Sequence, residues 1–230
     1  MSSRKAACVF LIAAGLTAST AHAQFGVPWQ QPPKVTVITA ESDHRLILVD
    51  EAVAFWNKTL EDLGSGFRLG SVTHLVRPIP EEALQALSRS IVDSFRRPLD
   101  VSEALRDLPG DLTILLGESD FVSFAGPFHA PGKRVVGIRS LNVRPLNLPN
   151  VARNVIAHEL GHAIGLGHNG DPAMLMCGRP APCRPPLFQS DVPRMFPLTD
   201  DEKGQLLRMY PPDWKPRSRL HVPAGPHAAA

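Results

Sequence analysis

Apolar residues recur along this chain at two different spacings, and the spacing predicts where its helices and strands lie. In residues 46–63 they recur with the period of an amphipathic helix, and Gly64 marks the expected end of that helix. Residues 80–95 show the same period, and Glu81 and Glu82 lie in the first turn, where acidic groups interact favourably with the helix dipole. Two helices are therefore expected in the first half of the chain.

Shorter apolar segments around these helices have the composition of strands. Residues 35–39 (VTVIT) and 112–116 (LTILL) are rich in β-branched or aliphatic residues and are too short to form stable helices. Residues 67–75 and 135–138 are further strand candidates. Strands that alternate with helices predict an α+β fold of α/β-like character, built around a mixed sheet.

The second half of the chain is expected to contain two more helices with a long loop between them. One begins at Asn150, a residue type that caps helix N-termini, and continues through the following turns. Residues 179–197 are rich in proline and lack periodicity, which is typical of a surface loop. The last helix spans residues 199–209, with Thr199 as N-cap and Glu202 three positions later, the pattern of a capping box.

The N-terminus has the pattern of a signal peptide. Arg4 and Lys5 give it a positive start, residues 6–17 are largely apolar, and residues 21–23 (AHA) form a small-x-small cleavage site. A membrane anchor is the alternative, but about 12 apolar residues are too few to span a bilayer, which needs about 20. We therefore expect cleavage after Ala23 and a mature protein that is secreted or periplasmic, without a stable membrane anchor.

The remaining chain is expected to form one domain with a short segment at each end. Residues 1–23 are the expected signal peptide, and residues 24–34, which include three prolines, form an N-terminal extension. Residues 35–210 contain all the predicted helices and strands and therefore form the domain. Residues 211–230, rich in Pro, Arg and Ala, are expected to form a flexible C-terminal tail.

Composition narrows the class of protein. The chain has 230 residues, of which 43% are hydrophobic and 20% charged, which suits one globular core and excludes disordered or fibrous classes. Without Arg4 and Lys5, the 22 remaining basic side chains balance the 22 acidic ones. A neutral chain without a cluster of basic residues lacks the charge that binds nucleic acid. Nucleic acid is therefore excluded as a partner. Separately, we expect the protein to be a monomer.

Two cysteines remain in the mature chain, because Cys8 lies within the expected signal peptide. In an oxidising compartment, Cys177 and Cys183 are expected to form a disulfide that closes a small loop. The alternatives are two free thiols, or Cys177 as an inhibitory ligand of a metal ion.

The segment HELGHAIGLGH carries the candidate chemistry. His158 and His162 are four positions apart, so both imidazoles project from one helix face and can bind the same ion. Gly165 can adopt a positive φ, end the helix and turn the chain back, so that His168 supplies a third ligand. Three imidazoles leave a fourth position for water. Glu159, beside the ion but off the ligand direction, can take the proton of that water.

This segment is similar to the HExxHxxGxxH signature of the metzincin zinc endopeptidases, and its five fixed positions all match. Met176 follows His168 by eight positions, where the resemblance implies the Met-turn that passes beneath the metal, with Met174 as the alternative. Weaker similarities follow the order found in matrixins across residues 35–210: Trp56, residues 110–115 (GDLTIL), residues 130–132 (APG) and residues 198–202 (LTDDE).

The resemblance implies a twisted mixed sheet and first helices above a cleft, an active-site helix below it, and a smaller C-terminal subdomain after the glycine turn. It also implies one catalytic zinc ion, with Glu159 as general base and Met176 as a structural floor. The loop that follows Cys177 would border the pocket for the side chain after the scissile bond. The implied zinc ligands are His158, His162 and His168.

Other features separate the chain from typical matrixins. Asn169 follows the third histidine, where matrixins usually have Ser. No segment corresponds to their inhibitory cysteine segment, and residues 24–34 are too few to form a propeptide. His129 lies near the second zinc site of animal matrixins, but the partner ligands of that site are missing, and no run of calcium ligands is present. Neither a structural zinc site nor a calcium site is predicted.

The sequence therefore predicts an exported zinc-dependent endopeptidase that acts on peptide or protein substrates. A noncatalytic module, in which a zinc site organises a peptide- or protein-binding surface, is the alternative from another class. A peptidase for cell-wall cross-links is the alternative among enzymes. Substrate turnover distinguishes the enzymes from the binding module.

Overall fold

The computed structural model describes residues 28–93, 102–127, 132–178, 190 and 192–217. Five strands form one sheet, in the order β2-β1-β3-β5-β4. Four of them run parallel to their neighbours, and β4 pairs antiparallel with β5 at one edge. The strands are β1 (Val35–Thr39), β2 (Val72–Val76), β3 (Leu112–Leu116), β4 (Phe124–Pro127) and β5 (Arg134–Ile138). The predicted mixed sheet is therefore confirmed.

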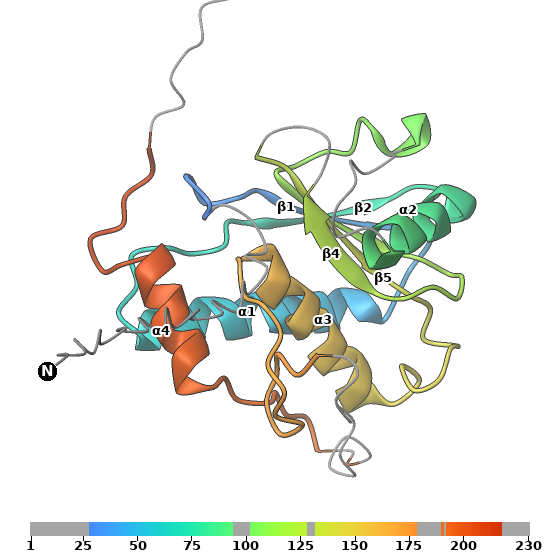
Figure 1. The fold of residues 1–230 in the computed structure, drawn as a ribbon. Helices are drawn as coiled ribbons and strands as arrows, with labels where there is room; N and C mark the ends of the chain where they lie inside the picture. The colour runs from blue at the N-terminus through green and yellow to red at the C-terminus, as the bar shows by residue number, and fades with distance from the viewer. Residues whose placement is uncertain (1–27, 94–101, 128–131, 179–189, 191, 218–230) are drawn as a thin grey trace, which may run out of the picture.

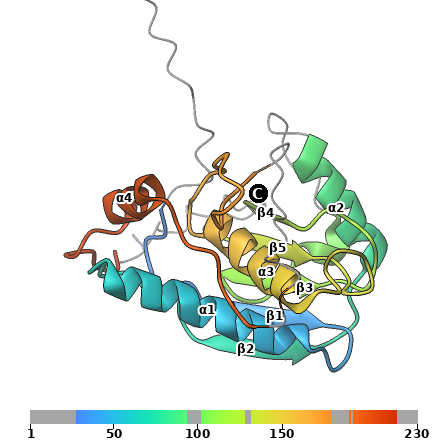
Figure 2. The same ribbon diagram turned by 90° about the horizontal axis from the view of Figure 1, so that it is seen from below.

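Helices cover both faces of this sheet (Figure 1). Two long helices, α1 (Arg45–Asp62) and α3 (Pro149–Ala163), lie side by side on one face, as Figure 2 shows from below. The helix α2 (Glu81–Asp93) covers the other face, together with a short 3₁₀ helix, η1 (Glu103–Leu105). The helix α4 (Asp200–Met209) follows at the end of the domain, beside the α1 and α3 layer. This arrangement of layers explains why the central strands β1 and β3 are buried on both faces, whereas the edge strand β2 is partly exposed.

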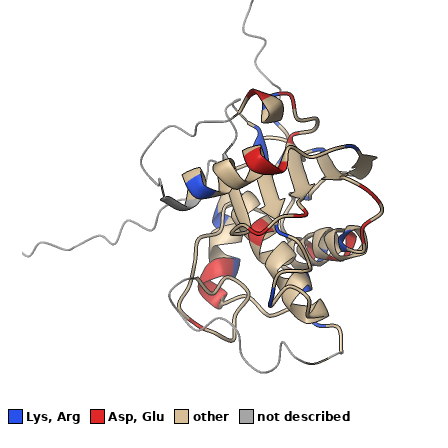
Figure 3. Cartoon of the chain, turned by 90° about the vertical axis from the view of Figure 1, so that its right-hand side faces the viewer, with Lys and Arg blue, Asp and Glu red and all other residues tan. Residues whose placement is uncertain are grey.

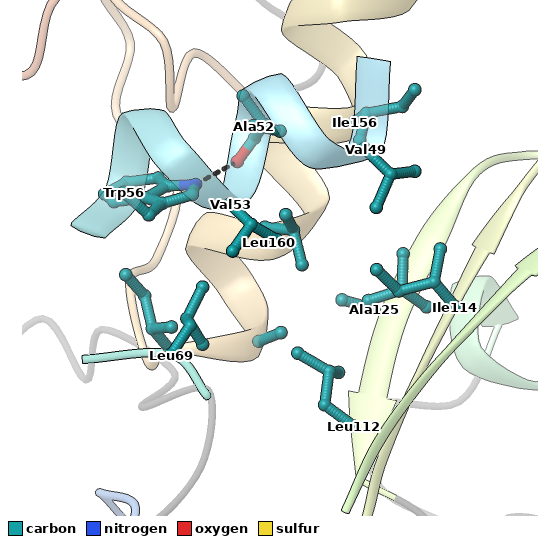
Figure 4. Packing of buried hydrophobic residues seen from close by; sticks show 14 of the residues in the cluster. Val49, Ala52, Val53, Trp56, Leu69, Leu112, Ile114, Ala125, Ile156 and Leu160 are labelled. Carbon is teal, nitrogen blue, oxygen red and sulfur yellow. Dashed lines mark hydrogen bonds between the residues drawn. The ribbon is translucent and has the colours of Figure 1, made fainter. Parts of the chain in front are cut away.

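The sheet divides the core into two clusters. Alternate residues of β1 and β3, such as Val37 and Ile114, point towards α1 and α3, whereas Ile38 and Leu115 point towards α2. Figure 4 shows the larger cluster, in which apolar side chains of α1 and α3 meet the sheet. Within it, Nε1 of Trp56 on α1 donates a hydrogen bond of 2.8 Å to the carbonyl oxygen of Ala157 on α3. The two helices are therefore joined by a directional contact as well as by apolar packing.

Most of the predicted elements are confirmed. The strands expected at residues 35–39 and 112–116 have the predicted bounds, and α4 begins with the predicted capping box of Thr199 and Glu202. The strand expected at residues 67–75 is shorter, because the chain pairs with β1 only from Val72 onward. The strand β4 was not predicted from the sequence, since its four residues (FAGP) include a glycine and a proline.

The predicted N-cap of α3 is wrong. Leu148 occupies that position in extended conformation, and Pro149 is the first helical residue, where the fixed φ of proline suits the helix. Asn150 lies inside the helix, and its Nδ2 donates instead to the carbonyl oxygens of Ser190 and Val192. Its side chain therefore anchors the segment before α4 and does not cap its own helix.

The packed part of the chain extends beyond residues 35–210 at both ends. Trp29 is buried in the larger core cluster, and Trp214 packs edge-on against Phe67. The N–H of Arg217 donates to the carbonyl oxygen of Gln30 at 2.8 Å, so the two flanking segments also contact each other. The predicted signal peptide, and most of the loop predicted at residues 179–197, lie outside the described residues.

In the view of Figure 3, the positions of Lys and Arg (blue) and of Asp and Glu (red) are interspersed along the described chain. None of the helices among the described residues is both long and apolar enough to cross a membrane.

Arg45 is an exception to the apolar core that the sequence did not reveal. Its side chain is 2% exposed, and its guanidinium donates to the carbonyl oxygens of Gly117, Ile138 and Arg139, at the ends of β3 and β5. It also forms ion pairs with Asp43 and Glu118. The first residue of α1 is thereby tied to the carboxyl edge of the sheet.

We predict that Arg45→Met destabilises the fold by about 3 kcal/mol, because it leaves a buried carboxylate and several carbonyls without their donor. Urea unfolding followed by circular dichroism measures the change. The exposed Arg106 gives the matched control, and Arg106→Met is expected to change the free energy of unfolding by less than about 0.5 kcal/mol. Equal effects of the two substitutions would contradict the anchoring role of Arg45.

Candidate metal centre

Two of the predicted ligands lie one turn apart on α3, which packs against both α1 and the sheet. His158 and His162 present their Nε2 atoms 3.0 Å from each other. The helix ends at Ala163, and Gly165 then adopts φ +112°, a conformation that glycine accepts at little cost. The chain turns back there and brings Nε2 of His168 to 2.9 Å from Nε2 of His162.

The three imidazoles form a compact donor set. Within the part of the chain that the structure describes, they are the group of side chains that could hold a metal ion, with ligand atoms all within 4.8 Å of one another. His162 is buried, His158 is partly exposed, and His168 is exposed. The set is therefore open on the side of His168 and closed towards the core.

Hydrogen bonds at the other ring nitrogens orient two of these imidazoles. Nδ1 of His158 lies 2.8 Å from the carbonyl oxygen of Leu175, and Nδ1 of His162 lies 2.8 Å from that of Leu166. A carbonyl oxygen only accepts, so both Nδ1 atoms must carry the proton. In a neutral ring, Nε2 is then left with a lone pair and no hydrogen, the state in which imidazole binds a metal ion.

The electrostatics favour the same protonation state. Burial lowers the pKa of His162 well below its usual value of 6.5, and the neighbouring His158 and His168 lower this pKa further. His162 is therefore neutral at neutral pH. The lone pairs on Nε2 of His158 and His162 face each other and gain little from their contact, whereas a divalent cation would be bound by these two nitrogens and by Nε2 of His168. The donor set thus fits a zinc ion, which histidine nitrogen binds readily.

The third ligand is supported by a short pairing between two loop segments. The N–H of Asn169 donates to the carbonyl oxygen of Met176 at 2.8 Å, and the N–H of Gly178 donates to the carbonyl oxygen of Asn169 at 2.9 Å. A Cβ atom placed on Gly178 would lie 2.4 Å from Cγ of His168, so the imidazole rests directly against this glycine. Sequence reasoning missed Gly178, because nothing in its local sequence reveals a contact with the ring of His168.

Met176 lies beneath α3 at the turn between the two helical ligands. It is fully buried, and a Cβ atom placed on Gly161 would lie 2.5 Å from its sulfur. The thioether can approach the helix this closely only because glycine, at position 161, has no side chain. Met174 is not buried in this way.

The end of α3 is held by residues that the sequence did not single out. Nε1 of Trp29 donates to the carbonyl oxygen of Ala163 at 2.9 Å, and the guanidinium of Arg134 donates to the same oxygen. The hydroxyl of Tyr210 donates to the carbonyl oxygen of Ile164 at 2.8 Å. Both carbonyls lie just before the glycine turn, so three distant segments fix the point where the chain turns towards His168.

Glu159 and the cysteines complete the predicted site. Glu159 follows the first ligand on α3, is 8% exposed, and does not belong to the donor set of the three histidines. Its predicted role as general base stays a prediction. Cys177 is buried and is not a free thiol, but Cys183 lies outside the described residues, so the predicted disulfide stays a prediction.

Known proteins offer only distant comparisons. No protein-family model matches the chain. Among solved structures, it is similar to archaemetzincin from Methanopyrus kandleri, with 19% identity over 78% of this chain and 96% of that one, at a TM-score of 0.43. It is also similar to metalloproteinase-II from Bacteroides fragilis, with 15% identity over 80% of this chain and 55% of that one, at a TM-score of 0.46. The chain therefore spans about half the length of the second protein.

We predict that Gly178→Ala weakens zinc binding about tenfold or more, since the new methyl group would displace the imidazole of His168. A competition titration against a chromophoric chelator measures the dissociation constant. Gly170→Ala is the matched control, because a Cβ atom there meets nothing within 4 Å. Unchanged affinity in Gly178→Ala would mean that the ring does not need this contact.

We also predict that removing the metal lowers the melting temperature, because a zinc ion held by the three imidazoles would join α3 to the loop that carries His168. At free zinc about 1,000-fold above the dissociation constant, binding stabilises the native state by about 4 kcal/mol. In a domain of this size, losing that stabilisation on chelation corresponds to a decrease of roughly 10 °C in the melting temperature. Calorimetry with and without chelator tests this, and His168→Ala should lose most of the difference.

Proposed function

We propose that the protein is a zinc-dependent endopeptidase of the metzincin type, which hydrolyses peptide or protein substrates. The observation that carries the proposal is that the Nε2 atoms of three imidazoles lie close together. In two of these imidazoles, Nδ1 donates a hydrogen bond to a backbone carbonyl oxygen. A buried carboxylate, Glu159, lies on the same helix between the first two ligands. This combination supports hydrolysis better than it supports a purely structural metal site, which has four protein ligands.

Each protein group has a distinct role in the proposed reaction. Zinc held by three imidazoles supplies a Lewis acid for the scissile carbonyl and lowers the pKa of a water ligand to about 7. Glu159 accepts the proton of the attacking water and then donates it to the leaving amine.

Further parts of the proposal rest on the sequence. The pattern of residues 1–23 supports export, to the periplasm or the medium, with cleavage after Ala23. The order of short segments across residues 35–210 supports a matrixin-like member, with Met176 as the floor of the site. A disulfide between Cys177 and Cys183 would pin the loop beside the pocket for the side chain that follows the scissile bond.

We predict that Glu159→Ala binds one zinc ion per chain and folds normally, but loses activity by about 10²–10⁴-fold, because the proton carrier is removed. Cleavage of a mixed peptide library, with the zinc content measured alongside, checks this. Glu61→Ala on the exposed face of α1 is the matched control and should retain full activity.

The same assay separates the other functions. Chelator-sensitive cleavage by the unaltered protein would establish the endopeptidase. Zinc bound at one ion per chain without cleavage of any peptide would favour a binding module, or an enzyme for cell-wall cross-links, which a digest of isolated cell wall would then reveal. Full turnover by Glu159→Ala would remove that residue from its proposed role.

A further inference from the structure

The third ligand differs from the other two in how it is held. His158 and His162 are fixed by the helix itself, whereas His168 lies on an exposed loop after the glycine turn. The position of its imidazole therefore depends on contacts between that loop and the rest of the domain. Its neighbour, Asn169, makes four of the hydrogen bonds in this region.

Both backbone groups of Asn169 are used in the pairing with residues 176–178. Its side chain makes two further hydrogen bonds: Oδ1 accepts from the N–H of Asp171 at 2.8 Å, and Nδ2 donates to Oε1 of Glu202 at 2.6 Å. Asn169 thus joins three parts of the structure next to the ligand. The pairing with residues 176–178 and the hydrogen bond with Asp171 are local, whereas the hydrogen bond to Glu202 reaches the first turn of α4.

Glu202 is a rigid partner for this amide. Its side chain is buried, and its second oxygen, Oε2, accepts from the N–H of Thr199 at 2.8 Å as part of the capping box. Both carboxylate oxygens therefore accept a hydrogen bond from a donor whose position is fixed. A second contact from the same helix, from Nε2 of Gln205 to the carbonyl oxygen of Gly165 at 3.1 Å, holds the turn before the ligand.

We propose that the hydrogen bond between Asn169 and Glu202 positions His168 for metal binding, so that α4 supports the third ligand. Asn169 and Glu202 are positioning residues, since they act through the backbone of the ligand loop and not on the substrate. The inference rests on the metal site of the proposed function, but it does not require that the protein cleaves peptides.

The polarity of this hydrogen bond allows a sharp test by exchange. Asn169→Asp removes the N–H donor and places a second carboxylate against the buried one, and repulsion between the two ionised groups should separate the loop from α4. In Glu202→Gln alone, the new side-chain NH₂ group faces either Nδ2 of Asn169 or the N–H of Thr199. Both of these are donors, so one hydrogen bond is lost. The double variant, Asn169→Asp with Glu202→Gln, restores a donor and an acceptor in reversed order, and the new carbonyl oxygen still accepts from Thr199.

We expect Asn169→Asp to raise the zinc dissociation constant about tenfold or more, and the double variant to return it to within about threefold of the original value. The visible spectrum of bound Co²⁺ reports the ligand geometry directly and should change and recover in the same way. Asn142→Asp makes the same chemical change on an exposed loop and serves as the control.

Urea unfolding of each metal-free variant separates positioning from general stability. If Asn169→Asp lowered stability but left the zinc dissociation constant and the Co²⁺ spectrum unchanged, the inference would be overturned. Failure of the double variant to recover affinity would overturn it as well. A recovered affinity in a protein that cleaves no peptide would support the inference while the proposed function failed. Absence of zinc binding by the unaltered protein would end both.

Discussion

The constraint on which this structure depends is the convergence of three imidazole nitrogens, with ligand atoms that all lie within 4.8 Å of one another. With Nδ1 of His158 and His162 committed to backbone carbonyls, the facing Nε2 atoms carry lone pairs, and burial keeps His162 neutral. A cation placed among the three Nε2 atoms would be bound by all of them, provided that the fold holds the rings in this arrangement. The surrounding fold therefore supports the helix and the loop that bring these nitrogens together.

That support comes from several sides. The hydrogen bond from Trp56 joins α1 to the middle of α3. Side chains of Trp29, Arg134 and Tyr210 donate hydrogen bonds to the carbonyl oxygens at the C-terminal end of α3. Carbonyls at a helix end have no partner within the helix, so these donors satisfy groups that would otherwise be buried without hydrogen bonds. The contact of Trp29 also brings the segment before the predicted domain into its core. A change far from the site in sequence can therefore alter the geometry of the metal centre.

The sequence predicted elements best where their pattern is local. The strands at residues 35–39 and 112–116, the long helix α1 and the capping box of α4 each follow from residues within one segment. Prediction failed where contacts with another part of the chain determined the local structure. The strand β4 exists because its short, glycine-containing segment pairs with β5, and Asn150 lies inside α3 because Pro149 begins the helix and the loop before α4 takes the amide.

For the site itself, the sequence alone determined the spacing of the ligands, because helix geometry places residues four positions apart on one face and glycine permits the turn that follows. Only the tertiary structure decided how the third imidazole is held. Gly178 contacts its ring, and Glu202, which lies 33 positions from Asn169, fixes the loop beside it. Contacts of this kind join residues distant in sequence through the packing of whole elements, and no local pattern of side chains encodes them.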